Sequence, residues 1–288
     1  MSTTKTKMIV CGVGVIAVML LGNSFAHATI VDPSTVSGMR LRLDANAITG
    51  LNDGDPVSTW NDTSGNGFNA AQSTAGQKPT YKINQMNGKP VVRFDGSNDV
   101  LTNSANATGA QTWFLVYRQA NTSGIQTIAS LYDPSGATSY DEVALLTFGG
   151  YQNISLRMDY LSFGNSVGIN PALDTSGHIL AFNYNGAGNS TPSNYGITYD
   201  QTAQTTLVSS TFARNTGEGG TIGARPASNF LNGDLAEMIV YNGVLSASDY
   251  SGIQGYLYDK WFVTAVIPEP STLVLLSISM LMLWQRRR

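Results

Sequence analysis

The sequence contains one cysteine, Cys11, and two histidines, His27 and His178. A disulfide within the chain is therefore excluded, and so is a zinc site made of several histidines. Charged residues make up only 12% of the chain, with no long run of one sign. The fold must consequently be stabilised by an apolar core, and a chain of this size is long enough to bury one.

The N-terminus has the three parts of a secretory signal peptide. Two lysines precede the apolar run 8–21, and small residues follow at Ala26 and Ala28. This order is typical of a signal cleaved after the second small residue. We predict that residues 1–28 are a signal peptide whose removal also removes Cys11. A cysteine nucleophile is thereby excluded in the exported chain.

The C-terminus carries a second targeting pattern. Residues 267–288 place a Pro-Glu-Pro motif before the apolar segment 273–284, and three arginines end the chain. As a helix, that segment would reach only ~18 Å, against ~30 Å for the hydrocarbon core of a bilayer. It is therefore short for a permanent anchor, although an ordinary single-pass tail anchor remains the alternative.

This arrangement resembles the PEP-CTERM sorting signal of exported proteins in Gram-negative bacteria that make extracellular polysaccharide. The resemblance implies an exosortase-type processing enzyme as a partner, and transient association of the helix 273–284 with the inner membrane. It implies that the sorting motif is Pro268, Glu269 and Pro270. The cytoplasmic stop would be Arg286, Arg287 and Arg288. The protein would end at the cell surface or in the extracellular matrix.

Removal of both terminal segments changes the charge. The 16 basic residues become 11, while all 19 acidic residues remain if Glu269 is kept, so the net charge moves from −3 to −8. Such a charge argues against nucleic acid or an anionic membrane surface as a partner. It favours neutral or calcium-bridged glycans over strongly anionic ones.

Residues 29–266 read as one all-β domain. Clusters of glycine, serine, threonine and asparagine recur about every ten residues and separate short runs rich in β-branched and aromatic residues. This pattern is typical of an antiparallel β-sandwich or jelly roll. The strands that we predict are 39–43, 89–94, 111–118, 126–131, 143–148, 154–158, 179–184, 195–199 and 234–241.

One helix is predicted near the end of this domain. Ser246, with Asp249 three residues later, forms a capping box. A stripe at helical spacing follows and should lie on the sandwich: Tyr250, Ile253, Leu257 and Trp261. Gly252 and Gly255 each cost about 1 kcal/mol in a helix interior, which indicates close packing of the backbone against a neighbour.

Several segments are similar to bacterial laminin G-like, concanavalin A-like domains. In chain order they are 60–67 (WNDTSGNG), 78–81 (KPTY), 87–96 (NGKPVVRFDG), 223–225 (GAR), 232–237 (NGDLAE) and 255–261 (GYLYDKW). The resemblance covers about residues 39–261 and implies a β-sandwich. It does not imply one function, because members of this superfold bind sugars, bind proteins, cleave glycans or fill a matrix. Arg42 departs from the family, which often has an aromatic residue there.

A calcium site is one interpretation of the loop after Trp60. Asp62, Ser64 and Asn66 place oxygen ligands on alternate residues before a glycine, as in the first half of a calcium-binding loop. The twelfth position is Ser73 rather than a bidentate glutamate, which excludes an EF-hand. The alternative interpretation is a polar turn without calcium.

The sequence gives little support to catalysis. Glycan-cleaving relatives place carboxylates two residues apart on one strand, and that pattern is absent. Asp141 and Glu142 are adjacent, whereas Asp234 and Glu237 are three apart, so each pair should point to opposite faces. We therefore predict a protein that is not an enzyme.

A serine triad is also disfavoured. Residues 164–168 match G-x-S-x-G, and Ser166, Asp174 and His178 follow in the order of α/β-hydrolases. The motif needs a helix directly after the serine, and Pro171 together with the lack of a helical stripe argues against one.

Aromatic and amide side chains suitable for sugar recognition are numerous, and no one of them is singled out. The aromatic candidates are Trp60, Tyr132, Tyr140, Tyr151, Tyr160 and Tyr195, and the amide candidates are Gln152, Asn153, Asn185, Asn189 and Asn194. The leading hypothesis is an exported, non-catalytic envelope or matrix protein that is structural, adhesive or associated with polysaccharide. The alternatives are a lectin-like module, with or without calcium, and a glycan-cleaving enzyme.

Overall fold

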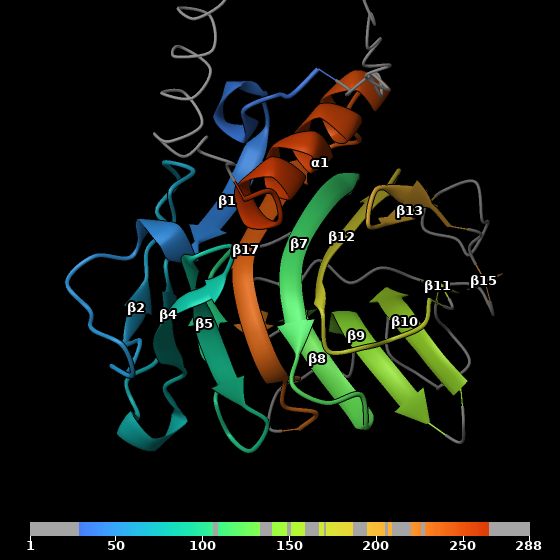
Figure 1. Ribbon diagram of the computed structural model, residues 1–288. Helices are drawn as coiled ribbons and strands as arrows, with labels where there is room; N and C mark the ends of the chain where they lie inside the picture. The colour runs from blue at the N-terminus through green and yellow to red at the C-terminus, as the bar shows by residue number, and fades with distance from the viewer. Residues whose placement is uncertain are drawn as a thin grey trace, which may run out of the picture.

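The protein is an antiparallel β-sandwich with one α-helix on its outer surface (Figure 1). This computed structural model describes residues 29–105, 109–132, 140–148, 151–158, 167–169, 171–186, 195–204, 207–208, 220–225 and 228–264. The predicted signal peptide and sorting tail lie outside these residues. Among the described helices, none has the length and apolarity required to cross a bilayer.

The sheet beneath the helix is called the helix-side sheet. Its order is β14 (Thr202–Ala203), β13 (Tyr195–Tyr199), β12 (Gly177–Tyr184), β7 (Gln111–Gln119), β17 (Asn232–Asn242), β5 (Lys89–Asp95) and β4 (Thr80–Met86). The eighth strand, β1 (Met39–Asp44), pairs with β17 off this path.

The second sheet has nine described strands. Its order is β15 (Leu207–Val208), β11 (Val167–Ile169), β10 (Tyr151–Met158), β9 (Tyr140–Phe148), β8 (Gly124–Tyr132), β16 (Gly220–Ile222), β6 (Leu101–Asn103), β3 (Ala70–Ala71) and β2 (Thr59–Trp60). Three short 3-10 helices lie in the connections: η1 (Pro33–Thr35), η2 (Ala45–Ala47) and η3 (Ala75–Gln77).

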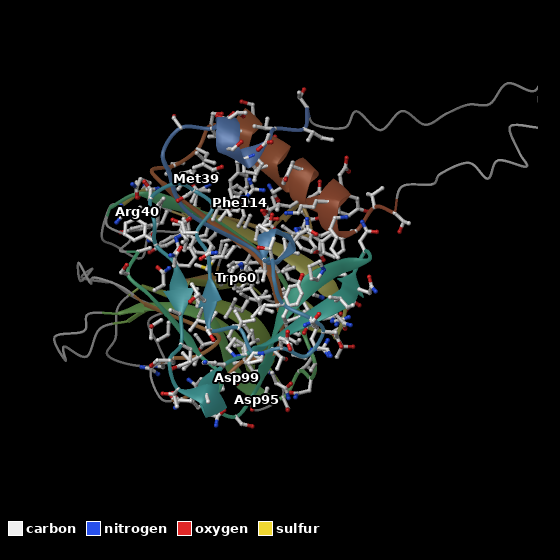
Figure 2. The ribbon with its side chains drawn as sticks, turned by 90° about the vertical axis from the view of Figure 1, so that its left-hand side faces the viewer. Met39, Arg40, Trp60, Asp95, Asp99 and Phe114 are labelled. Atoms are coloured by element: carbon white, nitrogen blue, oxygen red, sulfur yellow. The ribbon has the colours of Figure 1, made fainter. Side chains whose placement is uncertain are left out.

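The alternation of side chains on β7 explains the two apolar cores. Trp113, Leu115 and Tyr117 pack between the sheets, whereas Phe114 and Val116 pack under the helix. Figure 2 shows Phe114 beside the helix and Trp60 deeper in the molecule. A central strand that is apolar on both faces was expected from the sequence, and the structure confirms it.

The predicted helix is confirmed as α1 (Ala247–Trp261). The Ser246 hydroxyl accepts a hydrogen bond from the backbone N–H of Asp249 at 3.1 Å and donates one to its carboxylate at 2.7 Å. Gly252 packs against the N-terminal segment, where an added Cβ would lie 2.4 Å from Val31. The backbone N–H of Val31 also donates to the carbonyl of Gly252. The absence of a side chain at Gly252 therefore permits the close contact between α1 and Val31, as predicted from a glycine inside a helix.

A β-bulge in β17 changes which face of the sheet its side chains point to. The register of β17 against β7 shifts between Leu235 and Glu237. Ala236 packs in the outer core under α1, and the side chain of Glu237 contacts Lys260 and Trp261 of that helix. The expectation that Asp234 and Glu237 diverge was wrong, because the extra residue brings both to the outer face.

Glu237 is the centre of a buried charge cluster. Its carboxylate is 0% exposed and accepts hydrogen bonds from Arg42 Nε at 2.9 Å, Lys260 Nζ at 2.7 Å and Trp261 Nε1 at 2.8 Å. Lys260 also donates to Asp44 at 2.6 Å. Burial lowers the pKa of Arg42, but the charges and hydrogen bonds of Glu237 and Tyr256 together outweigh burial and raise that pKa above its ordinary value. The cluster joins β1, β17 and α1.

Each predicted strand overlaps an observed strand, and its ends lie within three residues of the observed ends. The shortest strands, including β2, β3 and β6, were missed because two or three residues carry no periodicity. β4 was also missed, since its alternation is interrupted at Asn84, which adopts a positive φ of 54°.

Replacing Glu237 by glutamine tests the charge cluster. The substitution keeps the shape but removes the carboxylate that Arg42 and Lys260 share, so that Lys260 keeps only Asp44, and we expect a loss of about 3–5 kcal/mol in the free energy of unfolding. Urea denaturation measures it. Asp53→Asn is the control, because Asp53 pairs with Lys82 at 2.7 Å at the exposed surface, where an ion pair contributes about 0–1 kcal/mol. Equal losses in the two variants would contradict a dominant role for the buried cluster.

Candidate functional site

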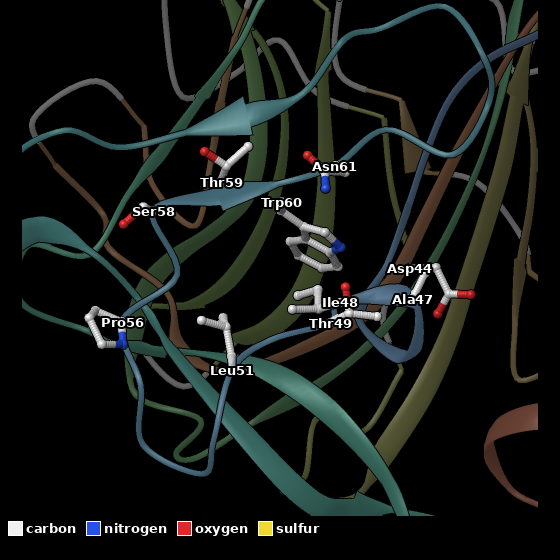
Figure 3. Close-up of a pocket in the computed structure, with 10 residues that line it drawn as sticks. All are labelled: Asp44, Ala47, Ile48, Thr49, Leu51, Pro56, Ser58, Thr59, Trp60 and Asn61. Carbon is white, nitrogen blue, oxygen red and sulfur yellow. The ribbon is translucent and has the colours of Figure 1, made fainter.

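A pocket of about 160 Å³ lies where β1 and η2 approach β2 (Figure 3). We call it the Trp60 pocket. Its lining residues are Asp44, Ala47, Ile48, Thr49, Leu51, Pro56, Ser58, Thr59, Trp60 and Asn61. The lining combines aliphatic side chains with hydroxyl, amide and carboxylate groups, which is a composition suited to a small polyhydroxylated ligand.

Local hydrogen bonds hold the pocket walls in place. Asp44 ends β1 and caps η2, because its Oδ1 accepts from the backbone N–H of Asn46 at 2.9 Å. On the opposite wall, the N–H of Val57 donates to the carbonyl of Pro79 at 2.8 Å. The carbonyl of Ser58 accepts from the N–H of Gln72 at 2.9 Å. These hydrogen bonds therefore fix the course of the main chain around the pocket.

Trp60 is the buried member of the lining. Its side chain is 0% exposed, and within the described residues its Nε1 has no hydrogen-bond partner. A buried donor left without an acceptor costs about 1–3 kcal/mol. In the view of Figure 3, the ring stands between Asn61 and Thr49, with its nitrogen turned to the side on which Asp44 lies. The pocket thus contains a donor that an acceptor group of a ligand would satisfy.

Asp44 is the charged member of the lining. It is 9% exposed and accepts from Lys260 Nζ, which also binds Glu237. A carboxylate offers about four acceptor positions, and the described contacts of Asp44 use two of them at hydrogen-bond distance. The buried charge cluster therefore orients Asp44 and leaves it able to accept from a ligand hydroxyl.

The structure brings the predicted calcium ligands together, but their atoms do not fit a cation. Asp62 Oδ1 accepts from the N–H groups of Arg42 at 3.0 Å and Ser64 at 2.9 Å. Its Oδ2 accepts from the Ser64 hydroxyl at 2.8 Å and the Phe68 N–H at 2.9 Å. Asn66 directs its Nδ2 to the carbonyls of Met39 and Arg40, both at 3.0 Å.

The side chains of Asp62 and Asn66 thus hold their loop against β1 through hydrogen bonds to its backbone. Four donors occupy the carboxylate, and the amide of Asn66 must present nitrogen to two carbonyl oxygens. Calcium needs six to eight oxygen ligands, so in this conformation the loop fits the interpretation of a polar turn. Among the described residues, no group of three or more acidic, histidine or cysteine side chains is placed to hold a metal.

The carboxylates of the other acidic turns are likewise engaged within the protein, either in their own turn or with strand β4. Asp95 Oδ1 accepts from the N–H groups of Ser97 at 2.8 Å and Asn98 at 3.1 Å. Burial and the charge of Asp95 raise the pKa of Asp99 to about 6. Asp53 binds Lys82 and the N–H of Ile83. These carboxylates stabilise turns rather than form a shared site.

His178 lies between two carboxylates. Its Nδ1 is 2.9 Å from Asp200 Oδ2 and its Nε2 is 3.0 Å from Asp174 Oδ1, and its ring stacks on Tyr199 at 4.8 Å. Both ring nitrogens are engaged, so the imidazole has no free nitrogen to activate a serine. Ser166 lies outside the described residues, so the structure does not place it.

Burial lowers the pKa of His178, but the hydrogen bonds and charges of Asp200 and Asp174 outweigh burial and raise that pKa above its ordinary value. The imidazolium is therefore the form that the two carboxylates favour.

The carboxylates on β17 are also engaged. Asp234 pairs with Arg93 and Arg118, and Glu237 pairs with Arg42 and Lys260. The side chains of Asp141 and Glu142 lie outside the description. Neither of these two carboxylates on β17 combines exposure with freedom from a cation, as a general acid or base for glycan cleavage requires.

Only some of the aromatic and amide candidates can be located. Trp60 lines the pocket, whereas Tyr195 is buried and stacks on Tyr184 at 4.9 Å, and Asn185 is exposed. The remaining candidates, or their side chains, lie outside the description. The sequence had not singled out Asp44, Thr49, Ser58, Thr59 or Asn61. The one local sequence signal among these residues is Asp44, an aspartate at the N-cap position of the short helix η2.

No protein-family model matches the chain, and no curated protein is significantly similar to it in sequence. Three solved structures are similar in fold. Domain 4 of AbnA, a GH43 extracellular arabinanase from Geobacillus stearothermophilus in complex with arabinotriose, is 11% identical with a TM-score of 0.51, over 75% of this chain and 98% of that domain.

The second is an arabinofuranosidase complexed with arabinofuranosyl-alpha-1,2-xylobiose, at 15% identity and a TM-score of 0.54, over 83% of this chain and 62% of the other. The third is a botulinum neurotoxin type C whose uptake into cells depends on interaction with two ganglioside molecules. It is 13% identical with a TM-score of 0.51, over 76% of this chain and 51% of the toxin chain. At such identities the likeness shows the fold alone, which is a jelly-roll β-sandwich.

The raised pKa of His178 predicts a pH dependence of stability. Because the folded pKa exceeds the unfolded value of about 6.5, the contribution is complete below that value and is lost as pH rises through the folded pKa. We expect the free energy of unfolding to fall above pH ~6.5, and His178→Gln to remove this fall. Urea melts across pH 5–9 measure both.

A second titrating group, Asp99, tests whether the fall in stability above pH ~6.5 comes from His178. Its pKa of about 6 in the folded protein also exceeds the unfolded value of 3.8, so its destabilising effect develops between those two values. Asp99→Asn should therefore change the slope below pH ~6 and leave the slope above pH ~6.5 intact. A slope above that pH that persists in His178→Gln would show that another group titrates there.

Proposed function

We propose that the chain is an exported, non-catalytic carbohydrate-binding module, and that the Trp60 pocket holds one sugar ring of its ligand. The observation that carries this proposal is the buried indole Nε1 of Trp60, which lacks a partner among the described residues and lines a pocket with polar walls. The fold supports it, because arabinotriose and arabinofuranosyl-xylobiose are bound in the structures of two proteins of similar fold.

The lining suggests how a sugar would be held. Nε1 of Trp60 would donate to a ring or hydroxyl oxygen, and Asp44 would accept from a second hydroxyl. The aliphatic side chains of Ile48 and Leu51 would cover the C–H face of the ring. Trp60 is too deeply buried to offer a stacking surface, so the indole contributes its N–H rather than its face.

The pocket dimensions limit the ligand. Its volume of about 160 Å³ is below the ~300–1,000 Å³ of sites for drug-sized molecules, which favours one sugar ring over an extended chain. Nε1 is itself covered, so a ligand reaches it only when side chains of the lining rotate. Rotamer changes of this kind are common at binding sites.

The same proposal includes export and sorting. The signal peptide 1–28 would direct the chain out of the cytoplasm, and an exosortase-type enzyme would process the tail at the motif that contains Glu269. Both ends of the described chain lie beside α1 (Figure 1). The amide of Asn87 donates to the carbonyl of Val263 at 2.7 Å, which holds the C-terminal end of the domain there. The domain would then be presented at the cell surface or in the matrix, where it would bind polysaccharide.

Replacing Trp60 by phenylalanine tests the pocket. The variant keeps an aromatic ring but removes the Nε1 donor, so we expect about a five- to ten-fold loss of affinity for the glycan that binds the unmodified chain. A glycan array that includes arabinan and arabinoxylan oligosaccharides identifies that glycan, and calorimetry on the full chain measures the change. Repeating the titration with and without calcium tests calcium assistance.

Trp113→Phe is the matched control. Trp113 is also buried, but its Nε1 already donates to Gln111 Oε1 at 2.9 Å. We expect this variant to lose stability and to retain the affinity. Equal affinity losses in the two variants, or no glycan binding by the unmodified chain, would reject the proposed pocket.

Mass spectrometry of the exported product tests the sorting proposal. We expect the mature protein to begin at Thr29 and to lack the three arginines 286–288. The residue at which the tail is cut follows from the same spectrum. A secreted product that still contains Arg288 would contradict processing by an exosortase-type enzyme.

A further inference from the structure

Three charged residues form a row across neighbouring strands of the helix-side sheet. Asp234 on β17 has Arg93 of β5 as its register partner on one side and Arg118 of β7 on the other. Neighbouring strands are about 4.8 Å apart, so the backbones of the two arginines lie about 10 Å apart with the carboxylate between them. We call these three residues the arginine row.

The buried carboxylate orders both guanidinium groups. Arg93 Nε donates to Asp234 Oδ1 at 2.7 Å and its Nη2 donates to Oδ2 at 3.1 Å, which is a two-pronged pair. Arg118 donates to Oδ2 through Nε at 3.0 Å and through Nη2. The side-chain carbonyl of Gln85 accepts from Arg93 Nη2 at 2.8 Å. Much of the entropy cost of ordering two long side chains is therefore already met before a ligand arrives.

The arginine row borders a cavity of about 300 Å³. Besides the row itself, the lining consists of Phe94, Gln119, Ala120, Thr175, Asn232 and Gly233. Gly233 has no side chain, and apart from Phe94 the remaining wall consists of small or polar residues. The side chains of Arg93 and Arg118 are 38% and 29% exposed, whereas that of Asp234 is 2% exposed. The cations therefore reach the cavity surface while the carboxylate lies beneath them.

The row carries an excess positive charge. One carboxylate neutralises one of the two guanidinium groups, which leaves a local charge of about +1. In the described part of the chain, Nη1 of Arg93 has no hydrogen-bond partner, and Nη1 of Arg118 has only a long 3.5 Å contact to the carbonyl of Gln85. Each guanidinium group therefore keeps one nitrogen, Nη1, for a ligand, and the two Nη1 groups together can donate to the two oxygens of one carboxylate.

We infer that the arginine row is a second saccharide site, specific for the carboxylate of an acidic sugar residue such as a uronic acid. The inference rests on the proposed carbohydrate-binding function but uses a site separate from the Trp60 pocket. The net negative charge of the domain disfavours anionic glycans at long range, whereas screening confines that field to about 8 Å at physiological salt. Within that distance, the local excess of positive charge attracts the carboxylate of the sugar.

Arg93→Gln is the decisive variant. It leaves Arg118 to neutralise Asp234, so the fold is retained while the excess charge disappears. We expect at least a roughly ten-fold loss of affinity for an oligogalacturonate probe, measured by calorimetry on the full chain at physiological salt. Affinity for the neutral glycan of the Trp60 pocket should not change. Arg118→Gln is a second variant with the same expected result.

Lys89→Gln is the matched control, because it removes one positive charge at the other end of the same strand, away from the cavity. We expect it to bind oligogalacturonate as well as the unmodified chain does. An equal loss in Lys89→Gln and Arg93→Gln would overturn the inference in favour of general charge attraction. Neutral-glycan binding without any oligogalacturonate binding would overturn this inference alone and leave the proposed function standing. Loss of neutral-glycan binding in Trp60→Phe but not in Arg93→Gln would confirm that the two sites are separate.

Discussion

The structure depends on one fully buried carboxylate. Glu237 receives hydrogen bonds from Arg42 on β1 and from Lys260 and Trp261 on α1. A buried charge is costly unless it is paired, so these three elements can dock only in the arrangement that brings their donors to Glu237. Lys260 extends the constraint to Asp44 at the wall of the Trp60 pocket. The pocket geometry is therefore a consequence of the contact between helix and sheet.

The bulge in β17 distributes two charge clusters over one face of the sheet. Because Asp234 and Glu237 both reach the outer face, each is surrounded by two cations from neighbouring elements. The cluster at Glu237 is covered by α1, so its charges fasten the helix to the sheet and orient Asp44. The arginine row lies beyond the helix, so its guanidinium groups remain accessible beside a cavity. The same chemical motif thus serves stability at Glu237, whereas at Asp234 we propose that it serves recognition.

Acidic turn residues have mainly structural roles in the loops that border the sandwich. Asp62 fastens its loop to β1, Asp95 closes its own turn, and Asp44 caps η2. Each carboxylate accepts backbone N–H groups that would otherwise be unsatisfied. The low content of charged residues is consistent with this use, since a large share of the acidic side chains described is occupied within the fold. Asp44 differs from the others because it also faces a pocket.

The sequence by itself determined the features that have a local period. The alternation along β7 predicted a strand with two apolar faces, and the cap at Ser246 with its stripe predicted α1, because these patterns depend only on neighbouring residues. The tertiary structure alone decided the partner of Arg42, which lies 195 residues away along the chain, as well as the bulge, the short strands and both cavities. Contacts between distant segments leave no repeating signal in the chain. They exist only once the sheets have packed together.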